Sequence, residues 1–326
     1  MFFLLLILSS PFYIDYPPCK NPTQEDYVKI DAMKQSLKIP ADDLSNEIAS
    51  RMQIGVYFPL AYPEKLPQKN LIKINQGGDC VVVSYADYGD RRPKKLLDRM
   101  QMELEKSGFN GYLYTLIGGY PTPRGNELCF AATPYAFKMF IMEEAYLLGF
   151  HSVLWLDARL FPLKDITPLF EMIKEHGALL NLTETLVSSR VSNEARECLL
   201  DFTQTDVLKN KAISTPVFGL DMHRPEVRAV LEDFYEACVL GIPFFSCYPE
   251  ETVLSALIAK HCKHIPFVSE HSPKIYPRLF IYSHSKYTDQ KLAVYAKKLE
   301  FYFFGISNEG ICDLEQIILH NALKRN

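Results

Sequence analysis

Three charged residues that are far apart in the sequence are predicted to meet at one edge of a sheet. Asp157 and Asp87 each come at the end of a run of apolar residues with the length and composition of a buried strand. Lys138 lies near the start of the helix predicted for residues 134–148. In a right-handed β-α-β unit, each helix begins at the edge where the preceding strand ends. The three side chains are therefore expected at the carboxyl edge, where open α/β sheets bind ligands and helix N-termini favour phosphate-like anions.

Lys138 is out of place in its own helix. The helix at 134–148 is almost wholly apolar, as in a buried helix, and only Lys138, Glu143 and Glu144 interrupt it. At about 100° per residue, Lys138 points away from both glutamates, and a cation near a helix start opposes the helix dipole. This placement favours an anionic partner, either a bound diphosphate or Asp157. The alternative is a surface lysine whose aliphatic chain covers apolar surface.

The elements that must position these residues alternate along the chain. The apolar runs predict strands at 80–85, 111–117, 153–156, 178–182, 216–220 and 279–283. The helices are predicted at 93–106, 134–148, 168–176, 225–240, 250–261, 291–301 and 313–323. Thr133 and Thr167 are expected to cap the helices that follow them. The fold class is therefore α/β, with an open, mostly parallel sheet and helices on both faces, as in Rossmann-like proteins.

The N-terminal part of the chain is organised differently. Residues 1–75 are predicted to be an apolar leader and a proline-rich extension with short helices at 24–37 and 41–52, and residues 76–326 to be the α/β domain. Residues 1–8 are purely apolar but too short to span a bilayer, which takes about 20 residues. They are a peripheral membrane contact, a buried end, a mis-assigned start or the core of an export signal that lacks its positive start.

Composition restricts the partners and the compartment. The formal net charge is -4 and no dense run of Lys and Arg occurs, so we expect no nucleic acid partner. The 8 cysteines are scattered without a Cys-x-x-Cys pair, which favours reduced thiols in the cytoplasm. A cytoplasmic or membrane-associated location is therefore expected, and export if residues 1–10 act as a signal peptide.

The segment 152–170 also resembles a known family. Its sequence, SVLWLDARLFPLKDITPLF, is similar to the "vLWLDaD" strand and "lkDitPLF" segment of GT-A fold glycosyltransferases that use nucleotide-diphosphate sugars, in particular glycosyltransferase family 8. The segment PYAFK at 134–138 resembles "PyafK" in the same family. Glu250 and Glu251 open a helix where the family has an Asp-Gln pair. The resemblance extends over roughly residues 79 to 265, and it is loose outside the strand at 153–156 and the helix that follows it.

What the resemblance implies is a donor-sugar site. The family's Asp-x-Asp carboxylates hold Mn²⁺ or Mg²⁺ against the donor diphosphate, and such cations prefer oxygen ligands. Here Asp157 is kept, and Arg159 stands where the second Asp is expected. An arginine cannot bind a metal ion, but it can bind a diphosphate through two hydrogen bonds. Either the metal ion is weakly held, or Arg159 takes over its role, or activity is lost.

The resemblance assigns roles to the charged residues. Asp157 and Glu250 are expected to be catalytic, with Asp157 also a metal or diphosphate ligand and Glu250 near the sugar or acceptor. Asp87, Lys138 and Arg159 are expected to bind the donor, and His264 is a weaker metal candidate.

The expected activity is transfer of a hexose from a nucleotide-diphosphate sugar to a glycan, protein or lipid acceptor. The alternative is a catalytically silent sugar- or nucleotide-binding relative, which Arg159 favours. A glycosidase fits less well, because the adjacent Glu250 and Glu251 cannot flank one bond. Asp221 and His223 precede the helix at 225–240 and are either caps or groups of the acceptor site.

Overall fold

The structure is a computed structural model that describes residues 60, 63–87, 93–131, 133–158, 160–162, 164–204, 206–246, 248–263 and 280–282. Several predicted features lie outside the described residues: Arg159, His264, the leader at 1–8, and the helices expected at 24–37, 41–52, 291–301 and 313–323. What the sequence predicts of them stays a prediction.

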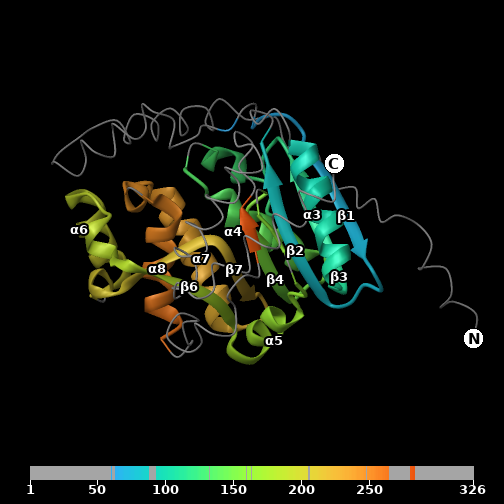
Figure 1. Cartoon of the computed structure of the whole chain (residues 1–326). Helices are drawn as coiled ribbons and strands as arrows, with labels where there is room; N and C mark the ends of the chain where they lie inside the picture. Colours follow the sequence, from blue (N-terminus) through green and yellow to red (C-terminus); the bar gives the residue numbers. More distant parts are fainter. Residues whose placement is uncertain are drawn as a thin grey trace, which may run out of the picture.

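The centre of the molecule is a six-stranded sheet with the order β1-β3-β2-β4-β7-β6 (Figure 1). Its strands are β1 (Gln68–Ile74), β2 (Cys80–Ala86), β3 (Gly111–Ile117), β4 (Ser152–Leu156), β6 (Ala178–Leu186) and β7 (Lys211–Asp221). β2 is parallel to β3 and β4, whereas β1 and β7 run antiparallel to their neighbours. β6 therefore points the same way as β4, and the sheet is mixed but mostly parallel. β5 (Leu160–Pro162) pairs with β8 (Phe280–Tyr282) in a separate ribbon.

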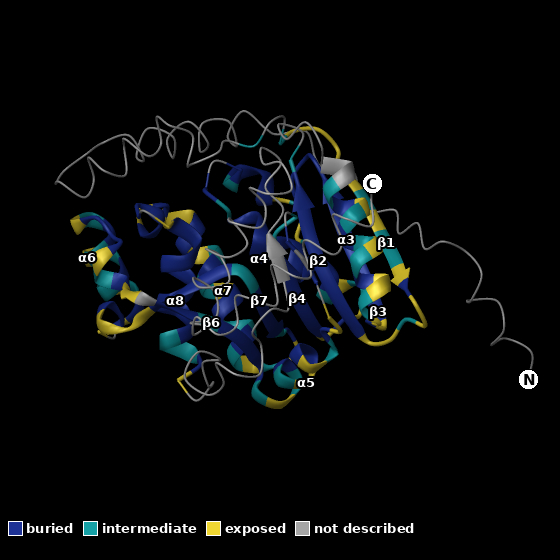
Figure 2. Ribbon diagram, in the orientation of Figure 1, coloured by how far each residue is buried: buried dark blue, intermediate teal, exposed yellow. Residues whose placement is uncertain are grey.

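Helices cover both faces of this sheet. The α-helices are α3 (Pro93–Ser107), α4 (Phe137–Leu147), α5 (Thr167–His176), α6 (Asn193–Thr203), α7 (Pro225–Leu240) and α8 (Pro249–His261). Residues alternate along the strands between two cores: Val81, Val83 and Trp155 pack with α4, α7 and α8, and Val82 and Leu154 pack with α3 and α5. β2 and β4 are buried throughout and α4 is buried from Phe137 to Ala145, which Figure 2 shows in dark blue. The predicted α/β class is confirmed.

Short 3-10 turns connect some of these elements: η1 (Glu127–Phe130), η2 (Val187–Ser189), η3 (Val207–Lys209) and η4 (Ile242–Phe244). Within the described ranges, no helix has both the length and the hydrophobicity that crossing a bilayer requires.

Both predicted threonine caps are wrong. α4 begins at Phe137 rather than near residue 134, because the backbone from Thr133 to Ala136 first makes a turn, with Ala136 N–H donating to Thr133 O. Thr167 is already the first residue of α5, and the Asp165 carboxylate accepts hydrogen bonds from both its N–H and its hydroxyl. Asp165 is thus the side chain that satisfies the start of α5.

The predicted convergence at one sheet edge is found. β2 and β4 are parallel with Val83 opposite Trp155, so Asp87 and Asp157, which follow these strands, lie at the same carboxyl edge. Lys138, in the first turn of α4, reaches this edge, since its Nζ lies 3.4 Å from Asp157 Oδ1. The edge therefore gathers residues from three separate parts of the chain.

Candidate functional site

Lys138 is the centre of a buried charged cluster at the carboxyl edge. Its Nζ donates to Glu250 Oε1 at 2.9 Å and to Thr215 Oγ1 at 3.2 Å, and it forms an ion pair with Asp157. The rings of Trp155 and Tyr135 lie 5.5 and 5.3 Å from the ammonium. The sequence-based alternative of a surface lysine is therefore wrong, and an anionic partner within the protein is present.

The cluster is buried unevenly. The side chains of Lys138 and Glu250 are 6% and 10% exposed, whereas that of Asp157 is 26% exposed. Burial opposes the charged form of Lys138, but Asp157 and Glu250 outweigh this effect and raise the pKa of Lys138. Burial raises the pKa of Asp157, with Glu250 adding to the effect and Lys138 opposing it. Lys138 thus stays charged, and Asp157 is the member of the cluster that solvent reaches most easily.

The geometry at Thr215 follows from the direction of β7. Because β7 is antiparallel to β4, its middle rather than its end lies beside Asp157, whose N–H donates to Pro216 O at 3.0 Å. Pro216 has no N–H, and it falls where the pairing of β6 and β7 is interrupted between Ser214 and Gly219. The interrupted ladder leaves the Thr215 N–H available, and Glu251 Oε1 accepts it at 3.0 Å.

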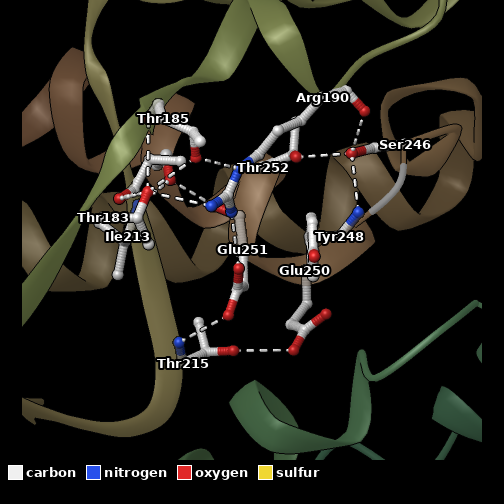
Figure 3. A network of polar contacts seen from close by, with 12 residues as sticks. Thr183, Thr185, Arg190, Ile213, Thr215, Ser246, Tyr248, Glu250, Glu251 and Thr252 are labelled. Carbon is white, nitrogen blue, oxygen red and sulfur yellow. Dashed lines mark hydrogen bonds and ion pairs between the residues drawn. The ribbon is translucent and has the colours of Figure 1, made fainter. Parts of the chain in front are cut away.

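Two adjacent glutamates in the first turn of α8 bind Thr215, one through its hydroxyl and the other through its backbone N–H (Figure 3). Glu250 Oε1 accepts from the Thr215 hydroxyl at 2.8 Å, while Glu251 accepts from its backbone. Acidic residues in the first turn of a helix also interact favourably with the helix dipole. The helix start therefore fixes the position of Glu250 next to Lys138.

Glu251 forms a second buried ion pair, with Arg190. Arg190 Nη1 donates to Glu251 Oε2 at 2.7 Å, and the same guanidinium donates to Thr183 and Thr185 and lies 4.5 Å from the Tyr248 ring centre (Figure 3). Burial, together with the charge of the neighbouring Glu250, raises the pKa of Glu251 to about 7, although Arg190 acts in the opposite direction. Arg190 thus positions Glu251, which in turn binds the Thr215 backbone next to the Lys138 cluster.

The other candidates from the sequence are placed as follows. Asp87 lies at the same edge as Asp157 and is partly buried. Asp221 pairs with Ser152 at the opposite end of β4, where it accepts from the His223 N–H and from Arg224. Asp221 therefore holds the turn that precedes α7, whose N-cap is Arg224, and neither Asp221 nor His223 belongs to the cluster.

Thr215 and Arg190 are members of this site that sequence reasoning missed. A threonine within a strand and an arginine after a 3-10 turn carry no sequence signal of their own. Only Pro216, the first residue of the predicted strand and an internal residue of the observed β7, points to an irregular backbone here.

The cluster fits a divalent metal ion poorly as it stands. Asp157 and Glu250 offer carboxylate oxygens, which Mn²⁺ and Mg²⁺ prefer. Lys138, however, lies between them and already neutralises part of their charge. In the parts of the chain that the structure covers, no group of three or more His, Cys, Asp and Glu side chains has the arrangement of metal ligands.

The site and the sheet define an α/β protein with a buried charged cluster at the carboxyl edge. No protein-family model and no curated protein sequence matches the chain. Among solved structures, the mannosyltransferase Ktr4p from S. cerevisiae in complex with GDP matches with 14% identity over 81% of this chain and 87% of that chain, at a TM-score of 0.38. A second X-ray structure of the mannosyltransferase Ktr4p from S. cerevisiae matches with 14% identity over 72% of this chain and 82% of that chain, at a TM-score of 0.34. Similarity at this level carries no conclusion about the activity of this chain.

Proposed function

We propose that the protein is a GT-A-like glycosyltransferase that transfers a hexose from a nucleotide-diphosphate sugar to an acceptor. One observation supports this proposal above all: Lys138, Asp157 and Glu250 converge at the carboxyl edge of an open α/β sheet. That edge is the place where such sheets bind nucleotides and related ligands. The resemblance of residues 152–170 to the donor-site strand of these enzymes agrees with it.

The proposed roles follow from exposure and hydrogen bonding. Asp157, the most exposed carboxylate of the cluster, accepts hydrogen bonds from the donor, and its own orientation is set by Trp155 Nε1, which donates to Oδ1 at 2.9 Å. Glu250 has one oxygen, Oε1, held by Lys138 and Thr215, so the other oxygen is available for a hydroxyl of the sugar or acceptor. Asp87 contacts the nucleotide. The Glu250 carboxylate, which is fixed by Lys138 and Thr215, orients the reacting groups without further rearrangement.

A silent sugar-nucleotide binder is the second candidate. It is favoured because both carboxylates of the cluster already share one ammonium, which lowers their capacity for acid-base chemistry. Both candidates predict donor binding, and only the first predicts turnover.

Ligand binding and turnover can be tested on the same preparation. A set of nucleoside diphosphates and nucleotide-diphosphate sugars is screened by thermal shift, because a ligand that binds the folded state raises its melting temperature. Release of free nucleoside diphosphate from any sugar donor that binds then measures transfer or hydrolysis. Binding with release supports the transferase, and binding without release supports the silent binder. If no compound binds, the proposed function is wrong.

Arg159 is predicted to supply the charge that a diphosphate needs. A cation beside Asp157 repels divalent metal ions and favours a free diphosphate. A nucleoside diphosphate should therefore bind in the presence of a chelator, and Arg159→Ala should weaken that binding by about 10- to 100-fold, the loss of one charged hydrogen-bonding group. Arg159→Asp should bind less without metal and depend more on Mn²⁺. Titration calorimetry with and without chelator measures both effects, and strict Mn²⁺ dependence of the wild type would contradict this role.

A further inference from the structure

The atoms around Lys138 Nζ have the chemistry of a metal-ion ligand set. Four oxygens lie within 3.4 Å: Glu250 Oε1, Asp157 Oδ1, Thr215 Oγ1 and the Thr215 carbonyl oxygen. Two carboxylates, a hydroxyl and a carbonyl are the groups that hard divalent cations prefer. The distances of 2.9 to 3.4 Å, however, fit an ammonium and exceed the metal–oxygen range of about 2.0 to 2.6 Å.

The two carboxylates among these four oxygens require a cation between them. Asp157 and Glu250 come from separate elements, and the backbone of β4 and α8 holds both of them against Thr215 and Trp155. Two carboxylates that approach one another in a largely buried site repel strongly unless a positive charge lies between them. Lys138 provides that charge from the first turn of α4, where its neighbours Phe137, Met139 and Phe140 are apolar.

A divalent ion and the ammonium cannot share this position. Both would take the same oxygens, and like charges a few Å apart repel strongly where water is sparse. Lys138 also has little contact with water, because its side chain is 6% exposed and α4 is buried from Phe137 to Ala145. A metal ion would thus have to displace a buried lysine from its partners.

We propose that Lys138 Nζ takes the place of the divalent metal ion at this edge, so that the site between Asp157 and Glu250 works without metal. That a donor binds here rests on the proposed function. The exclusion of a metal ion does not, because the four oxygens around Lys138 Nζ belong to the protein itself.

The test uses Mn²⁺ alone as the probe. Wild-type protein should bind no Mn²⁺ at this site by calorimetry and by electron paramagnetic resonance of the free ion. Lys138→Met removes the ammonium and leaves the four oxygens. Because the repulsion between the ammonium and the metal ion is then gone, this variant should bind Mn²⁺ at least about tenfold more tightly than the wild type does. Its melting temperature should rise on addition of Mn²⁺. The double variant Lys138→Met with Asp157→Asn should lose both gains.

Two further variants control for binding at the surface and for misfolding of Lys138→Met. Lys174→Met is the matched control, because Lys174 also lies between two carboxylates, Asp79 and Glu171, but at the surface, and it should gain nothing. Lys138→Gln keeps a donor for Glu250 and replaces Lys138→Met if the latter does not fold. Wild-type Mn²⁺ binding that Asp157→Asn abolishes, or a folded Lys138 variant that gains no site, would overturn the proposal. Because no nucleotide is used, failure of the proposed donor binding leaves this test unaffected.

Discussion

Asp157→Asn is expected to lower donor affinity or turnover by about 10- to 100-fold, the equivalent of one hydrogen bond to a charged group. The amide keeps the oxygen that accepts from Trp155 Nε1 but loses the charge of the most exposed carboxylate in the cluster. Lys138 remains paired with Glu250, so the free energy of unfolding should change by less than about 1 kcal/mol. Calorimetric titration of the donor and urea unfolding on the same protein measure the two effects separately.

Asp157→Ala separates the structural from the functional contribution. It should lose the same donor affinity, and in addition about 1–3 kcal/mol of stability, because the Trp155 N–H is left without its acceptor. Asp79→Asn is the matched control, since Asp79 precedes β2 at the opposite edge and pairs with Lys174. If Asp157→Asn keeps full donor affinity and loses stability instead, Asp157 is a structural residue and the proposed site is misplaced.

The central elements were predictable because their signals are local. β2, β3 and β4 are continuous apolar runs, and α7 occupies the predicted range, which begins with proline and is followed by glycine. Strand β1 was not predicted, since it falls at Gln68–Ile74 in the segment assigned to the N-terminal extension. It is an edge strand with alternating exposed residues, and its only described partner is β3. Such a strand lacks the continuous hydrophobicity of a central one.

Strand direction could not be obtained from the sequence pattern. Hydrophobic periodicity shows that Pro216 to Leu220 lies in a strand, but it carries no information on which way the strand runs. The antiparallel course of β7 brings Thr215 to the carboxyl edge and places Asp221 at the other one. This single reversal explains why Asp221 lies away from the charged cluster and why Thr215 was missed.

The charged cluster was only partly predictable for a related reason. Lys138 was detectable because a lone charge in an apolar helix needs a partner, and Asp157 because it follows a buried strand. The Arg190–Glu251 pair has no such local signal. It depends on η2 and α8 lying in contact, which is a property of the tertiary structure.

Arg190→Met is expected to destabilise the protein by about 3–5 kcal/mol, the cost of leaving a buried carboxylate without its partner. Arg190 is 3% exposed, and it holds Glu251 together with Thr183 and Thr185. Arg190→Met combined with Glu251→Gln removes the orphaned charge as well, so it should recover most of the loss. Arg224→Met provides the control, because its partner Asp221 is more accessible and the change should cost less than about 1 kcal/mol.

The cost of Arg190→Met should also depend on pH. The pKa of Glu251 is raised to about 7 in the folded protein, from an ordinary 4.5. Protonation of Glu251 therefore stabilises the folded state. This contribution is complete below pH 4.5 and is lost as the pH rises through about 7. Without Arg190 the charged form is disfavoured further, so the destabilisation by Arg190→Met should be larger at pH 8 than at pH 6. In the Glu251→Gln background the same substitution should cost less and show no such pH dependence. Urea unfolding of the four proteins at both pH values gives the coupling free energy of the pair, and equal costs in both backgrounds would mean that Arg190 and Glu251 act independently.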